Sequence, residues 1–567
     1  MSYKLKVDDR NYVHWDIYIS STLRIADVSL NPIQHKLFDQ DMFNISGDNV
    51  CIEHSSVRQM VTIPGVLVLS NKKTYGRWKR DKLLYKCIPD DRRLPIFLIP
   101  HKLKVGFNKK LTNKYITFKF FKWDKKHPQG TIVQVIGTVD KLEHFYEYQL
   151  YCKSLYASIQ NFTKDTMMAL KRRSEQEYID LIMQKNTIED RRNLHIFTID
   201  PSTSKDYDDG VGLRSIDDKT WCLSIYISNV SLWLDSMDLW SSFSQRIATI
   251  YLPDRRRPML PTILSDALCS LQENRIRFAL ALDIIIQKDT YEISAKTYHN
   301  TCICVSKNYH YDSDKLLQDT DYIQLKNIVI QLNKKNKYVD HLKDSHDFIA
   351  YLMIMMNYLS AQKMCSYKTG IYRALTFRPM QSIDKTIPSP IRKFLQGWMS
   401  SGGKYVTFED LEGHALLALD TYIHITSPIR RLIDLLNILN LQDKLGIYLY
   451  NEKSKKFHDD WTNALNYINR TMRSIRKVQN DCSLLDLCCK NIDMIKKIYS
   501  GFVFERIERN DGLYQYVVYL SELKMMNRIT MRYKLENQTI HSFKIYMFMD
   551  EDRLKQKIRL EYIPATK

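Results

Sequence analysis

Short apolar runs of β type, separated by turn residues, dominate the first 160 residues. Such runs occupy residues 65–69, 94–99, 115–121 and 132–136, and proline or glycine stands between or beside them. Short strands at this spacing are typical of small β-barrels. Alternating β-type runs return near the end of the chain, for instance at residues 514–519. The pattern therefore predicts small barrels in both terminal regions.

Between these regions the pattern changes to mixed helix and strand. Apolar residues recur at helical spacing over residues 174–186, 347–364, 428–442 and 461–495, and an apolar strand covers residues 195–199. The chain shows no internal repeat at a fixed period, no heptad pattern and no low-complexity tract. These features predict a large mixed α/β domain in the middle of the chain.

Composition adds a charge balance that changes the expected partner. The chain has 567 residues, of which 84 are Lys or Arg and 64 are Asp or Glu, so its formal net charge is +20, and 44% of its residues are hydrophobic. The length predicts several domains, and the hydrophobic content excludes disorder as the main theme. A basic balance of this size favours a polyanionic partner, because cations that neutralise phosphates release counterions. A merely soluble basic protein is the alternative.

Two basic stretches with interleaved aromatic residues, 72–80 and 114–126, point to a nucleic acid as this partner. A barrel face that presents cations to phosphates and rings to bases suits a single strand. The alternative is that many of these rings point into the barrel core.

The distribution of apolar residues and cysteines indicates the compartment. No run approaches the roughly 18 apolar residues that a membrane span needs, and the first residues, MSYKLKVDDR, have no apolar segment behind their charges. Eleven cysteines without a C-x-x-C pair are typical of buried thiols in a reducing compartment. We expect a cytoplasmic monomer without a membrane partner. Scarce glycine and abundant tyrosine suggest an AT-rich genome, such as that of a large DNA virus or a protist.

Four carboxylates converge after the apolar strand that ends at Asp200. Pro201 stops the strand, and a short Ser/Thr loop brings back Asp206, Asp208 and Asp209. Like charges a few Å apart repel one another, and hard divalent cations relieve this repulsion. A set of oxygen ligands suits Mg²⁺ or Mn²⁺ rather than zinc, and two such ions can activate a water in phosphodiester hydrolysis. The segment therefore predicts a catalytic metal centre.

A calcium loop and a solvated acidic turn are the alternatives for this segment. An EF-hand loop that began at Asp206 would need glycine at its sixth position and glutamate at its twelfth, but Val211 and Asp217 stand there. Apolar neighbours on both flanks argue against a solvated turn.

A second segment predicts a helix start that binds an anion. Ser427 is a good N-cap, and the proline after it suits the first helical position. Arg430 and Arg431 would then oppose the helix dipole unless an anion docks there. We assign Arg430 to a phosphate, whereas Arg431 can pair with Asp434 or Asp420.

These segments resemble the signature of the ribonuclease II superfamily, whose catalytic domain is called RNB. Its T-I-D-P and D-x-D-D elements match residues 198–201 and 206–209, and its H-x-T-S-P-I-R-R-x-x-D element matches residues 424–434. The elements Y-L-P, P-M-L-P and L-S-x-x-L-C-S-L match residues 251–271. All of them stand in the family order, and the resemblance spans about residues 190–480.

The resemblance implies an α+β multidomain fold. It consists of two N-terminal OB-type barrels of the cold-shock kind, a central mixed α/β RNB catalytic domain and a C-terminal OB-type RNA-binding barrel. We place these domains at residues 1–87, 88–160, 165–496 and 497–567, respectively.

The resemblance also implies an activity, namely processive hydrolysis of single-stranded RNA from its 3′ end to nucleoside 5′-monophosphates, with Mg²⁺ or Mn²⁺ as cofactor. Exosome-like partner proteins are compatible with it. Arg430 would bind the scissile phosphate, and Tyr251 would stack on the 3′-terminal base. The matching site residues are Asp200, Asp206, Asp208 and Asp209 as metal ligands, Asp208, Arg430 and Tyr251 as catalytic residues, and Tyr251, Arg373, Asn357, Trp123 and Arg430 as RNA-binding residues.

Four positions depart from the family pattern without removing a metal ligand: Gly210, Asn229, Leu432 and Gln479. They bear on rate and substrate preference more than on the class of reaction. Two other functions stay open, a catalytically inactive RNA-binding or regulatory protein on an RNB scaffold and a metal phosphodiesterase that acts on DNA. Four retained like charges speak against the inactive protein.

Overall fold

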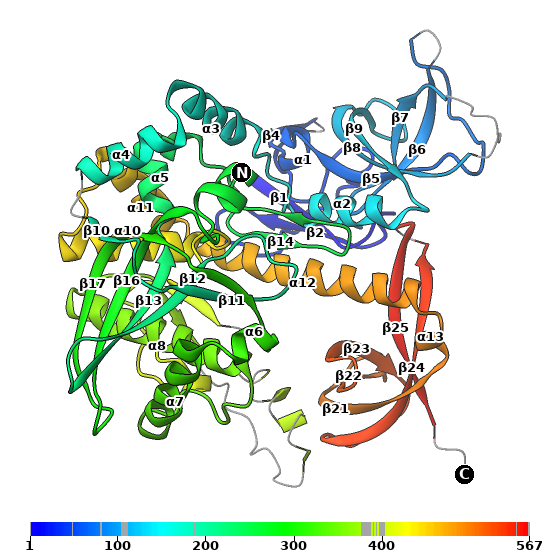
Figure 1. Ribbon diagram of the computed structural model, residues 1–567. Coiled ribbons are helices and arrows are strands. Elements are labelled where there is room, and N and C mark those ends of the chain that lie inside the picture. Colours follow the sequence, from blue (N-terminus) through cyan, green and yellow to red (C-terminus); the bar gives the residue numbers. More distant parts are fainter. Residues whose placement is uncertain are drawn as a thin grey trace. The chain divides into compact units, whose positions relative to one another are not determined.

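The computed structural model describes most of the chain and divides into two compact units (Figure 1). The described residues are 2–47, 49–79, 82–103, 111–185, 188–375, 387–388, 391–392, 394–395, 398, 403–551 and 553–564. Unit 1 comprises Met1–Tyr156, Leu252–Arg255 and Arg476–Lys567, and unit 2 comprises Ala157–Tyr251 and Arg256–Ile475. The predicted terminal regions therefore fall in unit 1, and the predicted α/β region falls mainly in unit 2.

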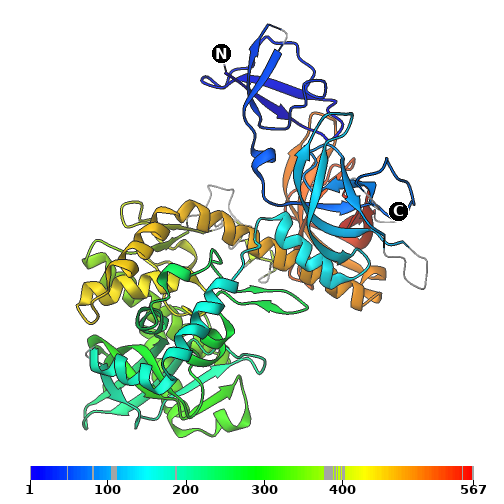
Figure 2. The same cartoon turned by 90° about the horizontal axis from the view of Figure 1, so that it is seen from above.

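Unit 1 begins with an open sheet, which Figure 2 shows in dark blue. Its strands, in the order β2-β1-β3-β4, are β2 (Trp15–Ile19), β1 (Ser2–Val7), β3 (Met42–Ser46) and β4 (Asn49–His54). Leu5, Ile17 and Phe43 point to one face and form its core, as the two-residue period of strands requires. Within the described residues these strands form a sheet, not the closed barrel that the sequence predicts.

A closed five-stranded barrel follows, with α1 (Ser56–Gln59) before it and α2 (Leu142–Cys152) after it. Its strands, in the order β5-β6-β7-β9-β8, are β5 (Ile63–Leu67), β6 (Leu83–Pro89), β7 (Phe97–His101), β9 (Gln129–Thr138) and β8 (Lys114–Lys122). Because Gly65 pairs with both Pro89 and Ile116, β5 belongs to this barrel. The predicted boundary between residues 87 and 88 therefore cuts through it.

Unit 1 ends in a five-stranded antiparallel sheet of barrel-like curvature, since its edge strands β23 and β25 contact each other. Its strands, in the order β23-β22-β21-β24-β25, are β23 (Met525–Met531), β22 (Tyr514–Leu520), β21 (Ile498–Glu508), β24 (Thr539–Asp550) and β25 (Lys555–Ile563). This agrees with the β-type pattern expected from residue 500 onward.

Unit 2 is built on a seven-stranded sheet covered on one face by α7 (Thr320–Lys335) and α8 (Ser345–Ser366), as Figure 1 shows. Its strands, in the order β10-β17-β16-β13-β12-β11-β18, are β10 (Ile188–Arg191), β17 (Ile293–Cys304), β16 (Ile276–Gln287), β13 (Thr220–Ser228), β12 (Asp209–Ser215), β11 (Phe197–Asp200) and β18 (Lys307–His310). Leu223, Ile225 and Ile227 face these helices and are fully buried. The large apolar core of this unit stabilises the sheet, and Asp200 and Asp209 lie at the ends of two of its neighbouring strands, β11 and β12.

The remaining described elements include two pairs of short strands, β14 with β15 and β19 with β20, and several helices. The strands are β14 (Ile250–Tyr251), β15 (Arg256–Arg257), β19 (Tyr372–Ala374) and β20 (Lys404–Val406), and the helices are α3 (Gln160–Arg172), α4 (Glu175–Lys185), α5 (Val230–Ser236), α6 (Asp314–Leu317), α10 (Leu432–Leu445), α11 (Glu452–Asn463), α12 (Leu465–Lys490) and α13 (Asp493–Lys496). Within the described ranges no helix is long and apolar enough to cross a membrane. All eleven cysteines are free thiols.

The predicted helix start at Ser427 is wrong. Helix α10 begins four residues later than its expected first residue, because the N–H groups of Arg430 and Arg431 both donate to the carbonyl of Ser427 and close a turn. The N–H of Ser427 itself donates to Asp434 Oδ1 at 2.8 Å. Asp434, which lies within α10, therefore holds the turn in place, and Ser427 is not the N-cap residue of the helix.

Candidate active site

The acidic loop lies between two adjacent strands of the seven-stranded sheet. Strand β11 ends at Asp200 and β12 begins at Asp209, and the two strands pair antiparallel through Phe197 and Val211. The loop must therefore reverse within a few residues, which returns Asp206 and Asp208 to the end of β11. This is the convergence that the sequence predicts.

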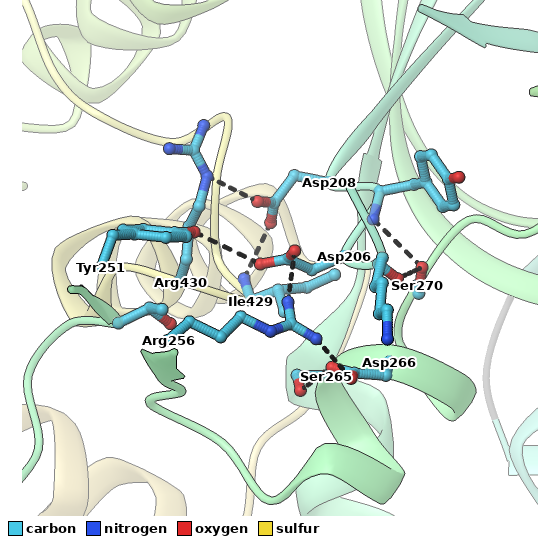
Figure 3. A network of polar contacts seen from close by, with 12 residues as sticks. Asp206, Asp208, Tyr251, Arg256, Ser265, Asp266, Ser270, Ile429 and Arg430 are labelled. Carbon is cyan, nitrogen blue, oxygen red and sulfur yellow. Dashed lines mark hydrogen bonds and ion pairs between the residues drawn. The ribbon is translucent and has the colours of Figure 1, made fainter. Parts of the chain in front are cut away.

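The motif around Ser270 holds this loop in place (Figure 3). Ser270 Oγ donates to the carbonyl of Lys205 at 2.9 Å and accepts from the N–H of Tyr207 at 3.0 Å. The N–H of Leu271 donates to the carbonyl of Tyr207 at 3.0 Å. The L-C-S-L element thus stabilises the loop, because it supplies hydrogen-bond partners for the backbone of a loop whose side chains repel one another.

Asp208 is the most enclosed carboxylate of the loop, with 2% of its surface exposed. The N–H of Ile429 donates to its Oδ1 at 2.9 Å, and Arg430 Nε donates to its Oδ2 at 3.0 Å (Figure 3). Burial raises the pKa of Asp208 to about 7, although Arg430 and the Ile429 N–H act in the opposite direction. The turn before α10 is therefore bound directly to the acidic loop, 221 residues away in the sequence.

Asp200 and Asp209 are crowded against each other. Burial and the charge of Asp209 raise the pKa of Asp200 to about 8, and burial raises the pKa of Asp209 to about 6. Asp200 Oδ2 is buried and has no hydrogen-bond partner among the described residues. An enclosed carboxylate oxygen without a donor is expensive, so this end of the sheet favours an added cation.

Asp206 is bound by two residues of the β14–β15 hairpin (Figure 3). Arg256 Nη1 donates to Asp206 Oδ1 at 2.6 Å, and the hydroxyl of Tyr251 lies 3.4 Å from Oδ2. Arg256 Nη2 binds Asp266 as well. Burial and the nearby Asp206 raise the pKa of Tyr251 to about 12, so its hydroxyl is a neutral donor, while 42% of the residue is exposed.

Arg256 and Asp266 were not predicted from the sequence. A signal for Arg256 exists, because it stands opposite Tyr251 in a two-stranded pair, and cross-strand partners point to the same face. No signal links Asp266 to the acidic loop, because their contact depends on a helical turn of residues 264–268.

The two arginines before α10 have different partners. Arg430 Nη2 donates to Ser427 Oγ at 2.9 Å, and the Arg430 side chain keeps 43% of its surface exposed. Arg431 pairs with Asp434 at 2.8 Å, which confirms one of the two pairings expected for it. Of these two arginines, Arg430 is therefore the one that lies at the acidic loop.

Asn357 does not face a ligand, so its prediction as an RNA contact is wrong. Only 3% of it is exposed. Its Nδ2 donates to the hydroxyl of Tyr422 at 3.0 Å, and its Oδ1 accepts from the N–H of Ile425 at 2.9 Å. It braces the segment that leads to Ser427 and Arg430.

Arg373 lies on β19, where its guanidinium binds the carbonyl of Gly403 and stands 5.0 Å from the centre of the Tyr405 ring. It is half-buried. Its assignment to RNA stays a prediction.

Trp123 lies in the core of the unit 1 barrel, so its prediction as an RNA-stacking residue is wrong. It is 7% exposed, and its ring centre is 4.7 Å from that of Phe38. Tyr115 and Phe118 of the same basic stretch are fully buried. The inward alternative is confirmed for these three rings, because an aromatic side chain gains more from the core than from solvent.

The donor chemistry at the acidic loop fits a hard divalent cation. Four carboxylates offer only oxygen ligands, and Asp200 Oδ2 is an enclosed acceptor without a donor. Within the described part of the chain, no three acidic, histidine or cysteine side chains are arranged to hold one ion. Asp206 and Asp208 are instead bound by Arg256 and Arg430.

The fold and the acidic loop define a recognised class of domain. Residues 188–331 match the RNB domain, and residues 84–147 match the Dis3-like cold-shock domain 2. These matches include the acidic loop, the β14–β15 hairpin and most of the unit 1 barrel.

Proteins with a similar sequence include several ribonuclease R proteins. The chain is 24% identical over 543 residues to ribonuclease R of Buchnera aphidicola, an alignment that covers 80% of this chain and 70% of that protein. Alignments with other ribonuclease R proteins span less than half of their length. The resemblance to the ribonuclease II superfamily, a family of RNB exoribonucleases, is thereby confirmed.

Solved structures show the same fold. RNase R of Mycoplasma genitalium, in complex with ribose-methylated single-stranded RNA, matches with a TM-score of 0.68 at 17% identity and covers 99% of this chain and 100% of its own. Yeast Ssd1, a pseudonuclease, matches with a TM-score of 0.55 at 14% identity over 100% of this chain and 82% of its own.

Proposed function

We propose that this chain is a cytoplasmic, metal-dependent exoribonuclease that degrades single-stranded RNA processively from the 3′ end. The observation that carries the proposal is Asp208, a nearly inaccessible carboxylate bound to Arg430 within a group of four acids. Such a group is costly to fold and has an evident use in phosphodiester chemistry. The RNB match and the ribonuclease R relatives support the same reaction.

The four carboxylates would hold Mg²⁺ or Mn²⁺, which when bound would activate water and stabilise the leaving oxygen. Asp208 positions Arg430 by accepting from its Nε. Arg430 Nη1 makes no hydrogen bond within the described residues, and the side chain is 43% exposed. The outer edge of this guanidinium is therefore placed to donate to a phosphoryl oxygen, where it would steady developing negative charge.

Tyr251 would set the position of the terminal nucleotide. Its hydroxyl is tied to Asp206 at 3.4 Å, while the residue keeps 42% of its surface exposed. A ring fixed at one end and open on its surface suits stacking with a base. It would determine how far the 3′ end reaches past the carboxylates.

The C-terminal sheet offers a surface for the RNA chain in place of the buried Trp123. A groove of about 830 Å³ there is lined by apolar side chains, one acid and several cations and rings, among them Arg528, Tyr533, Tyr546 and Arg559. Tyr533 and Tyr546 are 55% and 37% exposed. Rings for bases beside guanidinium groups for phosphates are what sequence-independent binding of a single strand uses.

A time course on 5′-labelled single-stranded RNA with Mg²⁺ tests the proposal. The wild type is expected to give a ladder or a short end product, and Asp208→Asn to leave the RNA full length. A matched 5′-labelled DNA of the same sequence serves as the control and is expected to stay intact, since the ribose hydroxyls distinguish the two substrates. Equal cleavage of the DNA would replace the proposal by a DNA phosphodiesterase.

A catalytically inactive RNA-binding protein is the second candidate, and the pseudonuclease Ssd1 among the structural neighbours favours it. In that case the wild type would bind the RNA and leave it full length with either Mg²⁺ or Mn²⁺. Binding is measured in the same samples by gel shift, so that loss of cleavage is separated from loss of binding.

A further inference from the structure

Arg256 is a cation placed among the very carboxylates that would attract a metal ion. Its guanidinium spans two acids, with Nη1 2.6 Å from Asp206 Oδ1 and Nη2 bound to Asp266 (Figure 3). The side chains of Arg256 and Asp206 are 22% and 10% exposed. Limited exposure keeps solvent from screening this ion pair, so it is stronger than a pair on the surface.

Both oxygens of Asp206 are engaged. Arg256 donates to Oδ1, and the hydroxyl of Tyr251 lies 3.4 Å from Oδ2. Tyr251 and Arg256 are cross-strand partners in the β14–β15 hairpin, so one short element closes this acid from two sides. A metal ion that binds Asp206 must therefore share these oxygens with the cation Arg256 and with Tyr251, or displace one of them.

We propose that Arg256 is a positioning residue that competes with the divalent cation for Asp206 and thereby sets the affinity of the site for the metal. The inference rests on the proposed function, because it takes Asp206 as a ligand of the cation. A guanidinium and a divalent ion on the same carboxylate repel each other, so binding of the ion displaces Arg256 Nη1.

Asp266 is the partner that Arg256 retains when it leaves Asp206. Its contact with Arg256 uses the other terminal nitrogen, Nη2, and is therefore independent of Asp206. Ser265 Oγ donates to Asp266 Oδ1 at 2.5 Å and fixes the orientation of this carboxylate. Arg256 thus moves from two acids to one rather than into solvent, which keeps the cost of metal binding moderate.

Titration of the metal-free, full-length protein with Mn²⁺ by isothermal calorimetry tests the inference without relying on activity. Arg256→Gln is expected to bind Mn²⁺ about tenfold more tightly than the wild type, because a neighbouring opposite charge shifts the equilibrium of a carboxylate by a decade or more. Arg256→Lys keeps the charge and is the matched control, with an affinity close to that of the wild type. Thermal melts verify that each variant is folded.

Asp266→Asn provides a second variant with the opposite expected sign. Without its second partner, Arg256 stays on Asp206, and Mn²⁺ binding weakens several-fold. In the Arg256→Gln background the same substitution is expected to have little effect, because the competing cation is gone. This double-mutant cycle separates an action through Arg256 from the mere loss of a negative charge near the ion.

The outcomes separate the inference from the proposed function. A wild type that binds no Mn²⁺ contradicts the metal site itself, and with it the proposed function. A wild type that binds Mn²⁺ while Arg256→Gln binds with equal or lower affinity overturns the competition alone. An effect of Asp266→Asn that persists in full without Arg256 also overturns it.

Discussion

The seven-stranded sheet carries buried acids at two places, Asp283 on β16 and the acidic loop between β11 and β12, and their surroundings differ sharply. Asp283 on β16 accepts two hydrogen bonds from Arg191, at 2.8 and 2.6 Å, and one from Ser224 at 2.6 Å. Burial acts to raise the pKa of Asp283, but these hydrogen bonds bring it below its ordinary value. At the acidic loop the balance is reversed, and the pKa values of Asp200 and Asp208 are raised to about 8 and about 7.

The difference teaches which buried charge is structural and which is available for function. Both oxygens of Asp283 accept hydrogen bonds from buried partners of the protein, so its charge is compensated and stabilises the sheet. Asp200 keeps an enclosed oxygen without a partner among the described residues. A carboxylate that folding leaves unsatisfied marks a site that an added cation can complete.

Removing Asp283 from its ion pair with Arg191 is expected to have the largest effect on stability. Asp283→Ala leaves Arg191 buried without its main partner and should lower the free energy of unfolding by about 3–5 kcal/mol, measured by urea denaturation. The double variant Asp283→Leu with Arg191→Met is the control, since it removes both charges and should recover most of the loss. A single variant as stable as the wild type would show that the pair contributes nothing.

Removing the charge of Asp200 should change the free energy of unfolding in the opposite direction. In metal-free protein at a pH above about 8, where the Asp200 carboxyl is ionised, Asp200→Asn is expected to raise the free energy of unfolding by about 1–2 kcal/mol, since a buried charge with an undonated oxygen is removed. The same variant should degrade no RNA. Denaturation with EDTA present gives the stability, and the labelled RNA assay gives the activity. Destabilisation of the metal-free protein by this variant would end the contrast between the two groups.

The pH dependence sharpens the comparison further. The pKa of Asp283 is lower in the folded protein than in the unfolded chain, so its stabilising contribution is present above the unfolded value of about 4 and is lost as the pH falls through the folded value. The difference in stability between the wild type and Asp283→Asn should therefore shrink toward acid pH. Denaturation curves at a series of pH values measure it, and a constant difference would mean that ionisation of Asp283 is not its source.

The smallest effect on stability is expected at Tyr251, because its ring is exposed and its contact with Asp206 is long. Tyr251→Ala should change the free energy of unfolding by about 0.5 kcal/mol or less, yet alter the length of the final RNA product. Tyr251→Phe keeps the ring and should preserve that length. An unchanged end product in Tyr251→Ala would assign the ring to packing alone.

Local pattern was sufficient for much of the fold. The helices expected at residues 174–186 and 347–364 are α4 and α8, with ends that differ by one or two residues, because long amphipathic or apolar segments determine their own helices. The convergence of Asp200 with Asp206, Asp208 and Asp209 was also predictable, since it follows from a strand and a short return loop. The true start of helix α10, after Ser427, was not predictable. It depends on the hydrogen bond from the N–H of Ser427 to Asp434, which lies inside the helix.

Side-chain direction was decided by contacts between distant parts of the chain. Trp123 is buried because Phe38, 85 positions earlier, packs on its ring. The sequence of a basic, aromatic stretch does not by itself indicate which of its rings point into the core. Asn357 was predicted to bind RNA, but its Nδ2 and Oδ1 are bound to Tyr422 and Ile425.

The sequence by itself determined the identity and clustering of the carboxylates, the succession of β-rich and mixed regions, and the resemblance to the RNB exoribonucleases, because these depend on residue types at short spacing. Only the tertiary structure decided that Arg430 meets Asp208, that Arg256 lies between Asp206 and Asp266, and that β5 joins the barrel. Such pairings bring together residues from different elements, and hydrogen bonds and burial act on distance in space, which local sequence does not encode.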